Sequence, residues 1–86
     1  MYVNGSGAHA EGYVSSGIMD ASGAGAHAEG YNTHALNTAA HAEGFNTHAT
    51  GNYSHSEGYY TTASANYAHA EGAETLASGT ASHAEG

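Results

Sequence analysis

The stretch His-Ala-Glu-Gly at residues 41–44 decides the fold of this chain, because it recurs at a fixed spacing along nearly the whole sequence. It is repeated at 9–12, 27–30, 69–72 and 83–86, and His-Ser-Glu-Gly at 55–58 is a further copy with one change. The spacing from one copy to the next is 18 at the first interval and 14 at each later one. A period this short is the length of one coil of a narrow solenoid, in which each repeat contacts only its neighbours.

Each 14-residue unit divides into two heptads, and the second heptad position is Ala in ten of the twelve segments. The seventh position is always Ala, Ser or Thr, and the fourth is Gly except at Asn37 and Ala65. Because side chains alternate across a strand, the second, fourth and seventh positions share one face, which we predict to be the interior of the roll. The Gly and Asn residues of the fourth position are expected to take left-handed backbone at tight corners.

One interruption breaks the heptads. Ser-Gly-Ile-Met at 16–19 accounts for the single spacing of 18, and we interpret it as a loop that projects from one corner of the roll. Residues 1–86 are otherwise expected to form a single repeat domain. Because the chain opens and closes inside the repeat, we expect it to be a fragment of a longer fibrous protein.

Other repeat architectures agree less well with this pattern. A coiled coil needs large apolar residues at paired heptad positions, and a Gly in nearly every heptad costs a helix about 1 kcal/mol each. Collagen needs Gly at every third residue, and calcium-binding nonapeptide rolls need Asp and a different period. A disordered Gly/Ala/Ser chain would not hold its register over so many copies. The strand solenoid is therefore the favoured interpretation.

The composition restricts the partners of the chain. Lys and Arg are absent, and eight acidic residues give a formal net charge of −8 with His neutral. A chain without permanent cations is poorly suited to nucleic acid or to anionic membranes, because neutralising phosphate needs Lys or Arg. There is no Cys, and large apolar residues are scarce, so we expect an oligomer to supply the missing buried surface.

The repeat resembles the head repeat of YadA-like trimeric autotransporter adhesins and the related repeats of phage tail and neck appendage proteins. The family unit is a small residue, an apolar residue, Ala, an apolar residue and Gly, and residues 40–44 match it at the small, Ala and Gly positions. The resemblance implies an all-β, left-handed parallel β-roll with two short strands per 14-residue coil, assembled as a parallel homotrimer. It also implies an extracellular, cell-surface or virion location.

In that family the two apolar positions face the threefold axis, and here they are His and Glu. We expect a polar network on the axis, in which an imidazole N–H is donated to a carboxylate of a neighbouring chain or layer. No metal or other cofactor is expected. The alternative is that metal ions bind in axial His and Glu layers. A surface metal site at the outward pair His34 and His48 is a weaker alternative. The axial residues are His9, Glu11, His27, Glu29, His41, Glu43, His55, Glu57, His69, Glu71, His83 and Glu85.

Aromatic residues follow the Gly of four successive coils and are predicted to stack as a ladder at one corner. Tyr53 and Tyr67 are predicted to form a second, shorter row. Packing at the corner is the simpler interpretation, and a contact surface for a carbohydrate or a protein is the functional one. The residues proposed for this surface are Tyr13, Tyr31, Phe45, Tyr59 and Tyr60.

The sequence therefore predicts a structural protein, a head or shaft segment that extends and presents attachment surfaces. Its partner is expected to be itself, with a host surface glycan or protein as a further partner. The alternatives are an attachment module that binds a glycan or protein and a self-stacking filament subunit. An enzyme is not expected, because a catalytic site is one unique constellation and this strand is repeated six times.

Overall fold

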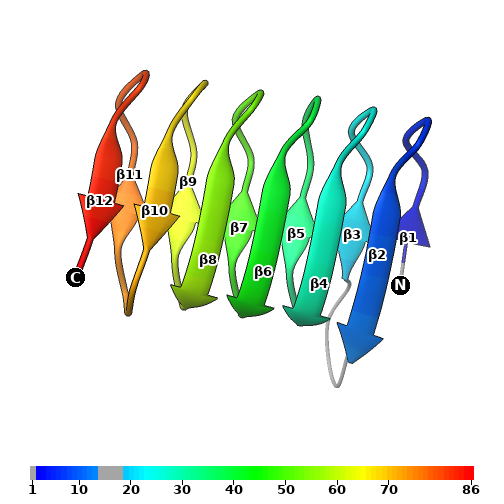
Figure 1. Cartoon of the computed structure of the whole chain (residues 1–86), viewed down its shortest axis with the longest axis horizontal. Helices are drawn as coiled ribbons and strands as arrows, with labels where there is room; N and C mark the ends of the chain where they lie inside the picture. The colour runs from blue at the N-terminus through cyan, green and yellow to red at the C-terminus, as the bar shows by residue number, and fades with distance from the viewer. Residues whose placement is uncertain (1, 14–18) are drawn as a thin grey trace.

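The computed structural model describes residues 2–13 and 19–86, which form an all-β parallel solenoid of about six coils (Figure 1). Each coil contributes one strand to each of two parallel sheets, as the repeat predicted. The short-strand sheet contains β1 (Tyr2–Val3), β3 (Asp20–Ala21), β5 (His34–Ala35), β7 (His48–Ala49), β9 (Thr62–Ala63) and β11 (Leu76–Ala77). The His–Glu sheet contains β2 (His9–Tyr13), β4 (His27–Tyr31), β6 (His41–Phe45), β8 (His55–Tyr59), β10 (His69–Glu71) and β12 (His83–Glu85).

The register between coils follows the repeat without slippage. His41 pairs with His55 and Glu43 with Glu57 in the next coil, while His9 pairs with His27 across the longer interval. Backbone bonds continue this ladder beyond the strands, as where the N–H of His41 donates to the carbonyl of Ser54 at 2.9 Å. The described residues measure 27 × 24 × 13 Å, so the solenoid is thin in one direction. None of them belongs to a helix that could cross a membrane.

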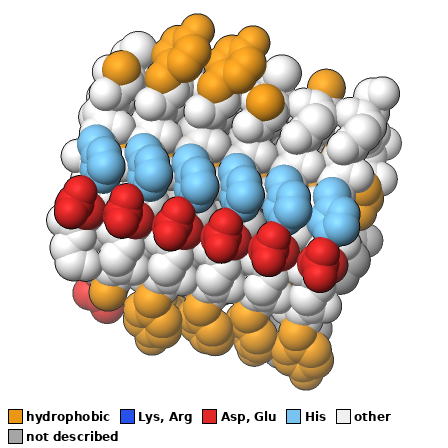
Figure 2. Space-filling view, viewed as in Figure 1, with side chains coloured by type: hydrophobic (Ala, Val, Ile, Leu, Met, Phe, Trp, Pro, Cys, Tyr) orange, Lys and Arg blue, Asp and Glu red, His pale blue; other side chains and the backbone are white. Residues whose placement is uncertain are grey.

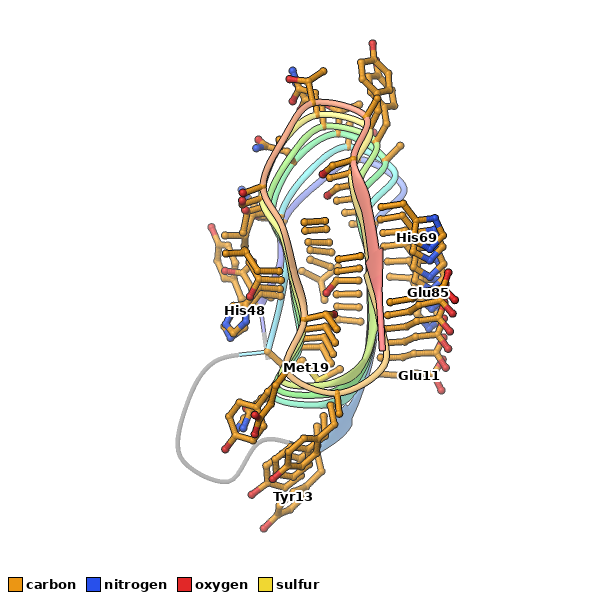
Figure 3. The ribbon with its side chains drawn as sticks, turned by 90° about the vertical axis from the view of Figure 1, so that its left-hand side faces the viewer. Glu11, Tyr13, Met19, His48, His69 and Glu85 are labelled. Atoms are coloured by element: carbon orange, nitrogen blue, oxygen red, sulfur yellow. The ribbon has the colours of Figure 1, made fainter. Side chains whose placement is uncertain are left out.

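The core is a single layer of small side chains between the two sheets (Figure 3). Ala28, Ala42 and Ala70 of the second heptad position and Thr33 and Thr47 of the seventh are completely buried. This confirms the predicted interior for these two positions. The interior is narrow because both sheets present almost only methyl and hydroxyl groups to it.

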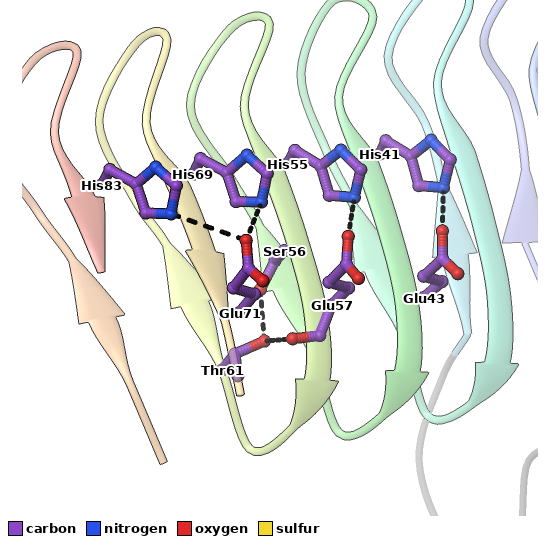
Figure 4. A network of polar contacts seen from close by, with 9 residues as sticks. All are labelled: His41, Glu43, His55, Ser56, Glu57, Thr61, His69, Glu71 and His83. Carbon is purple, nitrogen blue, oxygen red and sulfur yellow. Dashed lines mark hydrogen bonds and ion pairs between the residues drawn. The ribbon is translucent and has the colours of Figure 1, made fainter. Parts of the chain in front are cut away.

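The His–Glu strand β8 carries Ser56 where the other five strands of that sheet have Ala, and Thr61 of the same coil accommodates the change. The hydroxyls of Ser56 and Thr61 lie 2.7 Å apart, and the Thr61 hydroxyl also donates to the carbonyl of Glu57 at 3.1 Å (Figure 4). The buried hydroxyls of Thr33 and Thr47, which face Ala in their own coils, have no such partner. The Ser at position 56 is thus tolerated because it hydrogen-bonds inside the core.

The fourth heptad position is not where the corners turn, which corrects the expectation from the sequence. The left-handed residue of each described corner is at the sixth position, where even Tyr53, Tyr67 and Glu74 have φ between 55° and 63°. The fourth-position Gly of the His–Glu sheet is exposed rather than interior, with φ from 105° to 135°, whereas Gly23 and Gly51 at the fourth position of the other heptads are buried as predicted. Gly is needed there because coils approach closely: a Cβ on Gly44 would lie 2.2 Å from the carbonyl oxygen of Gly58.

Met19 is the second correction, because it lies in the core and not in a projecting loop. Its side chain is completely buried, and its carbonyl accepts a hydrogen bond from the N–H of Tyr2 at 2.7 Å. The carbonyl of Thr33 accepts from Asp20 in the same way, so Met19 fills a seventh heptad position. An unbranched, flexible side chain can fill an irregular gap in a core of small residues. The rest of the predicted loop, 16–18, lies outside the described residues.

Candidate functional site: the His–Glu face

The outer face of the His–Glu sheet carries two parallel rows of side chains (Figure 2). Residues two apart in a strand point to the same side, so His and Glu of each copy face outward while the Ala between them faces the core. The parallel register then places each His beside the His of the next coil and each Glu beside the next Glu. The His row is His9, His27, His41, His55, His69 and His83, and the Glu row is Glu11, Glu29, Glu43, Glu57, Glu71 and Glu85.

The imidazole rings of the His row form a continuous stack. Neighbouring ring centroids are 4.5–4.8 Å apart, and the rings are inclined by 18° or less. This spacing is that of adjacent strands in a sheet, about 4.7–4.9 Å, so the backbone ladder sets the stack. Each imidazole therefore has one edge free to reach sideways toward the Glu row.

Each imidazole of the His row pairs with the carboxylate two residues further along its own strand. The distance from Nε2 to Oε1 is 2.7 Å in His41–Glu43 and His55–Glu57, and 3.0 Å in His69–Glu71 (Figure 4). The sequence led us to expect these partners in a neighbouring chain or layer, whereas within this chain they are in the same strand. Among the described residues, only one His–Glu ion pair crosses between coils, from His83 to Glu71 at 3.5 Å.

The hydrogen-bond alignment of the His–Glu contacts differs along the His row. In His41 the ring nitrogen makes a directed hydrogen bond to Glu43. The Nε2 atoms of His55 and His69 are buried and close to their carboxylates, yet neither makes a hydrogen bond of acceptable angle. Those two contacts are ion-pair distances without hydrogen-bond alignment. The centre of the face thus has two buried ring nitrogens that lie close to a carboxylate without an aligned hydrogen bond.

Burial lowers the pKa of His55 below its ordinary value of 6.5. The neighbouring rings of His41 and His69 act in the same direction, while Glu57 and Glu43 oppose it. A lowered pKa means that the imidazole at the centre of the row is neutral at pH 7. A neutral ring has one N–H donor and one acceptor nitrogen, which suits a ring that pairs with a carboxylate on one side.

A second His pair lies on the opposite face, on the short-strand sheet. His34 and His48, which the sequence placed outward and one coil apart, stack with centroids 4.7 Å apart and an interplanar angle of 3° (His48 is labelled in Figure 3). Burial lowers the pKa of both, and the charge of His34 lowers that of His48 further. Asp20 pairs in register with His34 and partly offsets the shift. This acidic neighbour was not anticipated from the sequence.

The aromatic ladder has the predicted order at the corner that follows the His–Glu strands. Ring centroids are 5.3 Å apart for Tyr13–Tyr31, 4.6 Å for Tyr31–Phe45 and 5.3 Å for Phe45–Tyr59. Tyr60 joins the ladder, because its ring packs edge-on against Tyr59 at 4.6 Å. Its left-handed backbone, φ 54°, turns the ring back toward that corner.

The shorter aromatic row predicted from the sequence is also present. The rings of Tyr53 and Tyr67 stack at 5.4 Å with an interplanar angle of 11°. Both residues are more than half exposed, like Tyr13 at the start of the ladder. The molecule therefore presents two separate aromatic rows, which allows one to serve as a control for the other.

Four groups in the His–Glu face bring together donor atoms that suit a metal ion. Each contains two stacked His of adjacent coils and the Glu paired with the first, and in each group all the ligand atoms lie within 4.8 Å of one another. The groups, here called triads, are His27–Glu29–His41, His41–Glu43–His55, His55–Glu57–His69 and His69–Glu71–His83.

Comparison of the chain with protein-family models, with curated proteins and with solved structures found no match. The YadA-like resemblance of the repeat remains a resemblance. Function is therefore inferred from the chemistry of the two faces and the two aromatic rows.

Proposed function

We propose that the chain is a structural head or shaft segment of a trimeric fibrous surface protein, of the adhesin or phage-appendage type. The observation that supports this best is the unbroken register of the coils, which places the same groups on the same face at every level. Each added coil lengthens such an object by about 4.8 Å without changing its cross-section. That is the property needed in a part that extends and presents attachment surfaces outside a cell or on a virion.

The thin core supports assembly into an oligomer. Of the twelve fully buried hydrophobic side chains among the described residues, eleven are Ala and one is Met19. Burying a methyl or methylene group contributes about 0.8 kcal/mol, while ordering the backbone costs roughly 1–2 kcal/mol per residue. The apolar core therefore offsets only a small part of the chain entropy. A partner that buries a further face is the simplest source of the missing stabilisation.

The His–Glu face is the surface we assign to the trimer interface. Its side chains are only partly covered in the single chain, with His41 at 35 % and Glu43 at 41 % exposure. The face is regular along the solenoid, so three copies related by an axis parallel to it make the same contacts at every level. The left-handed roll and the parallel threefold arrangement belong to this proposal and follow the YadA-like resemblance.

The solution mass tests the assembly. Sedimentation equilibrium over a wide concentration range should give three times the chain mass of 8.6 kDa. His41→Trp, on the proposed axis, should dissociate the trimer, because three large rings then compete for the space of three imidazoles. His48→Trp changes the same heptad position on the opposite sheet and should leave the mass unchanged.

Three results of that experiment would count against this assembly. A folded 8.6 kDa species at all concentrations rejects it, and so does an equal response of the two variants. A mass that grows without limit as concentration rises would instead favour the self-stacking filament.

A second candidate function, attachment to a glycan or protein through the aromatic ladder, is favoured by the exposure of its rings. Tyr13, Tyr59 and Tyr60 are 62 %, 48 % and 49 % exposed although each packs against a neighbouring ring of the ladder. Stacked, partly exposed rings with hydroxyl groups suit both sugars and protein interfaces. The proposed partner is thus a host surface glycan or protein, as an extension of the structural role.

Paired substitutions test this surface. Tyr59→Ser with Tyr60→Ser should weaken binding to an immobilised glycan array or cell surface at least tenfold. Tyr53→Ser with Tyr67→Ser removes as many exposed rings from the second row and should leave binding intact. Equal losses in the two double variants, or none in either, would contradict an attachment role for the ladder.

A further inference from the structure

We propose that the His–Glu face binds divalent transition-metal ions, such as Zn²⁺ or Cu²⁺, between successive coils. Each ion takes the Nε2 atoms of two stacked His and one oxygen of the Glu beside the first of them. This goes beyond the structural role and does not depend on it, because every ligand of a site comes from one chain.

The distances are close to those that a metal needs. Zn–N bonds are about 2.0–2.1 Å long, so two nitrogens bound to one tetrahedral Zn²⁺ ion are separated by roughly 3.4 Å. The ligand atoms of each triad already lie within 4.8 Å of one another. Closing that gap needs a shift of at most about 1.4 Å, shared between two side chains whose exposed edges can rotate. The coil ladder itself need not move.

The donor set selects the kind of ion. Two imidazoles and one carboxylate suit Zn²⁺ and Cu²⁺, while Ca²⁺ and Mg²⁺ prefer sites built from oxygen. Three protein ligands leave a fourth tetrahedral position for water or for a group of a neighbouring copy.

The buried ring nitrogens at the centre of the face point to a missing partner. Nε2 of His55 and of His69 are buried and make no aligned hydrogen bond, although each lies near a carboxylate. In its neutral form, an imidazole can carry its proton on Nδ1 and leave Nε2 as a lone-pair donor. A cation placed between the two rings and Glu57 would use both nitrogens and the carboxylate together.

The negative charge of the Glu row also favours a bound metal ion. The Glu row sets carboxylates side by side along the coils, and the sequence contains no Lys or Arg to neutralise them. A divalent ion bound to two neutral His and one Glu turns a local charge of −1 into +1. Metal binding therefore relieves the repulsion along the row without any basic residue.

Adjacent triads share one His, so they cannot both be filled. His41 belongs to the first and second triads, His55 to the second and third, and His69 to the third and fourth. Four triads in which neighbours exclude each other hold at most two ions per chain. Alternate sites lie two coils apart, about 9.6 Å, which also reduces repulsion between the ions.

The shared His residues predict how many Zn²⁺ ions each variant binds. The experiment titrates Zn²⁺ into the metal-free chain by isothermal calorimetry and measures the bound zinc after dialysis. The native chain should bind about two ions, and His55→Asn should still bind two, because the first and fourth triads survive. His41→Asn with His69→Asn breaks every triad and should lose binding by at least a hundredfold. His34→Asn with His48→Asn removes two stacked His from the opposite face and should bind like the native chain.

Several outcomes would overturn the proposal. The first is no uptake of Zn²⁺ at roughly 0.1 mM, a concentration chosen to exceed the Kd of a three-ligand site. The others are a loss of Zn²⁺ binding in the His34/His48 variant but not in the His41/His69 variant, and an equal loss of binding in both. If the His41/His69 variant does not fold, by circular dichroism, electron paramagnetic resonance of Cu²⁺ on the native chain decides. Two imidazole nitrogens per copper support the site between coils, and a single nitrogen rejects it.

Discussion

Replacing Gly44 with Ala tests whether close stacking of coils, rather than corner geometry, is the reason for the Gly of the repeat. A Cβ at this position would lie 2.2 Å from the carbonyl oxygen of Gly58, where ordinary contacts begin at 3.4 Å. The coils must therefore separate locally by about 1.2 Å, a quarter of the roughly 4.8 Å strand spacing. One coil further along, the equivalent ladder bond from the N–H of Tyr59 to the carbonyl of Gly72 is 2.9 Å long, and an opening of about 1.2 Å would break a bond of that length.

The expected cost has two parts. Holding Ala at φ 112° costs about 1–3 kcal/mol, and one or two lost ladder bonds cost about 0.5–1.5 kcal/mol each. Together they give about 1.5–6 kcal/mol, a large share of the stability of a small domain. Urea unfolding followed by circular dichroism measures the loss directly, as a lower midpoint at an unchanged slope.

Gly25 provides the matched control. It also has positive φ, 69°, but a Cβ there would meet nothing within 4 Å. Ala39 and Ala81 already occupy the equivalent corner with φ of 54° and 60°. Gly25→Ala should therefore cost only about 1 kcal/mol, the ordinary penalty of left-handed backbone. Losses for the two variants that agree to within about 0.5 kcal/mol would refute the close-stacking explanation.

Three further changes test the core and the titrating groups. Ala42→Leu should overpack the interior and cost about 1–3 kcal/mol in urea unfolding, whereas Thr50→Leu on the outer face should be nearly silent; equal effects would show that the faces are misassigned. Ser56→Ala should change stability by less than about 1 kcal/mol, because Thr33 and Thr47 already lie beside Ala in their own coils; a larger loss would mean that the Ser56–Thr61 bond is essential. Burial lowers the pKa of His34 and His48, so the folded state binds fewer protons than the unfolded state below about pH 6.5. Stability should be complete above that pH and should fall as pH decreases toward 5, and the His34→Asn, His48→Asn variant should show a weaker dependence. A melting temperature that peaks near pH 5 in the native chain would contradict this.

The 14-residue period was sufficient to predict the parts of the structure that depend on alternation and register. Alternation placed Ala42 inside and His41 outside, and equal spacing placed Phe45 on Tyr31. These features follow from strand geometry alone, so they need no knowledge of energies. The aromatic ladder was predictable for the same reason.

The errors arose where local residue preference was used in place of coil contacts. Left-handed backbone at Tyr67 and Glu74 goes against residue preference, yet their N–H groups donate to Asn52 and Tyr59 in the preceding coil at 2.9 and 2.8 Å. Such bonds between coils hold residues that would rarely adopt this conformation alone. Met19 was assigned to a loop because it belongs to the four residues that interrupt the heptads, and no sequence signal marked the gap that it fills. The pairing of each His with the Glu of its own strand was missed because the period determines the register but not the side-chain rotamers.

The two roles proposed for the His–Glu face are linked through its charge. With neutral His, neighbouring carboxylates of the Glu row about 4.8 Å apart repel by roughly 0.9 kcal/mol per pair even in water, and more once a partner excludes solvent. Assembly of three chains around that face adds further carboxylates to the same axis. An ion that binds each chain would reduce this cost, so binding and assembly should strengthen each other reciprocally. Sedimentation with EDTA and with Zn²⁺ separates the cases: a trimer that tightens with Zn²⁺ supports the coupling, a trimer indifferent to Zn²⁺ removes the coupling alone, and a monomer that binds Zn²⁺ removes the assembly but keeps the metal site.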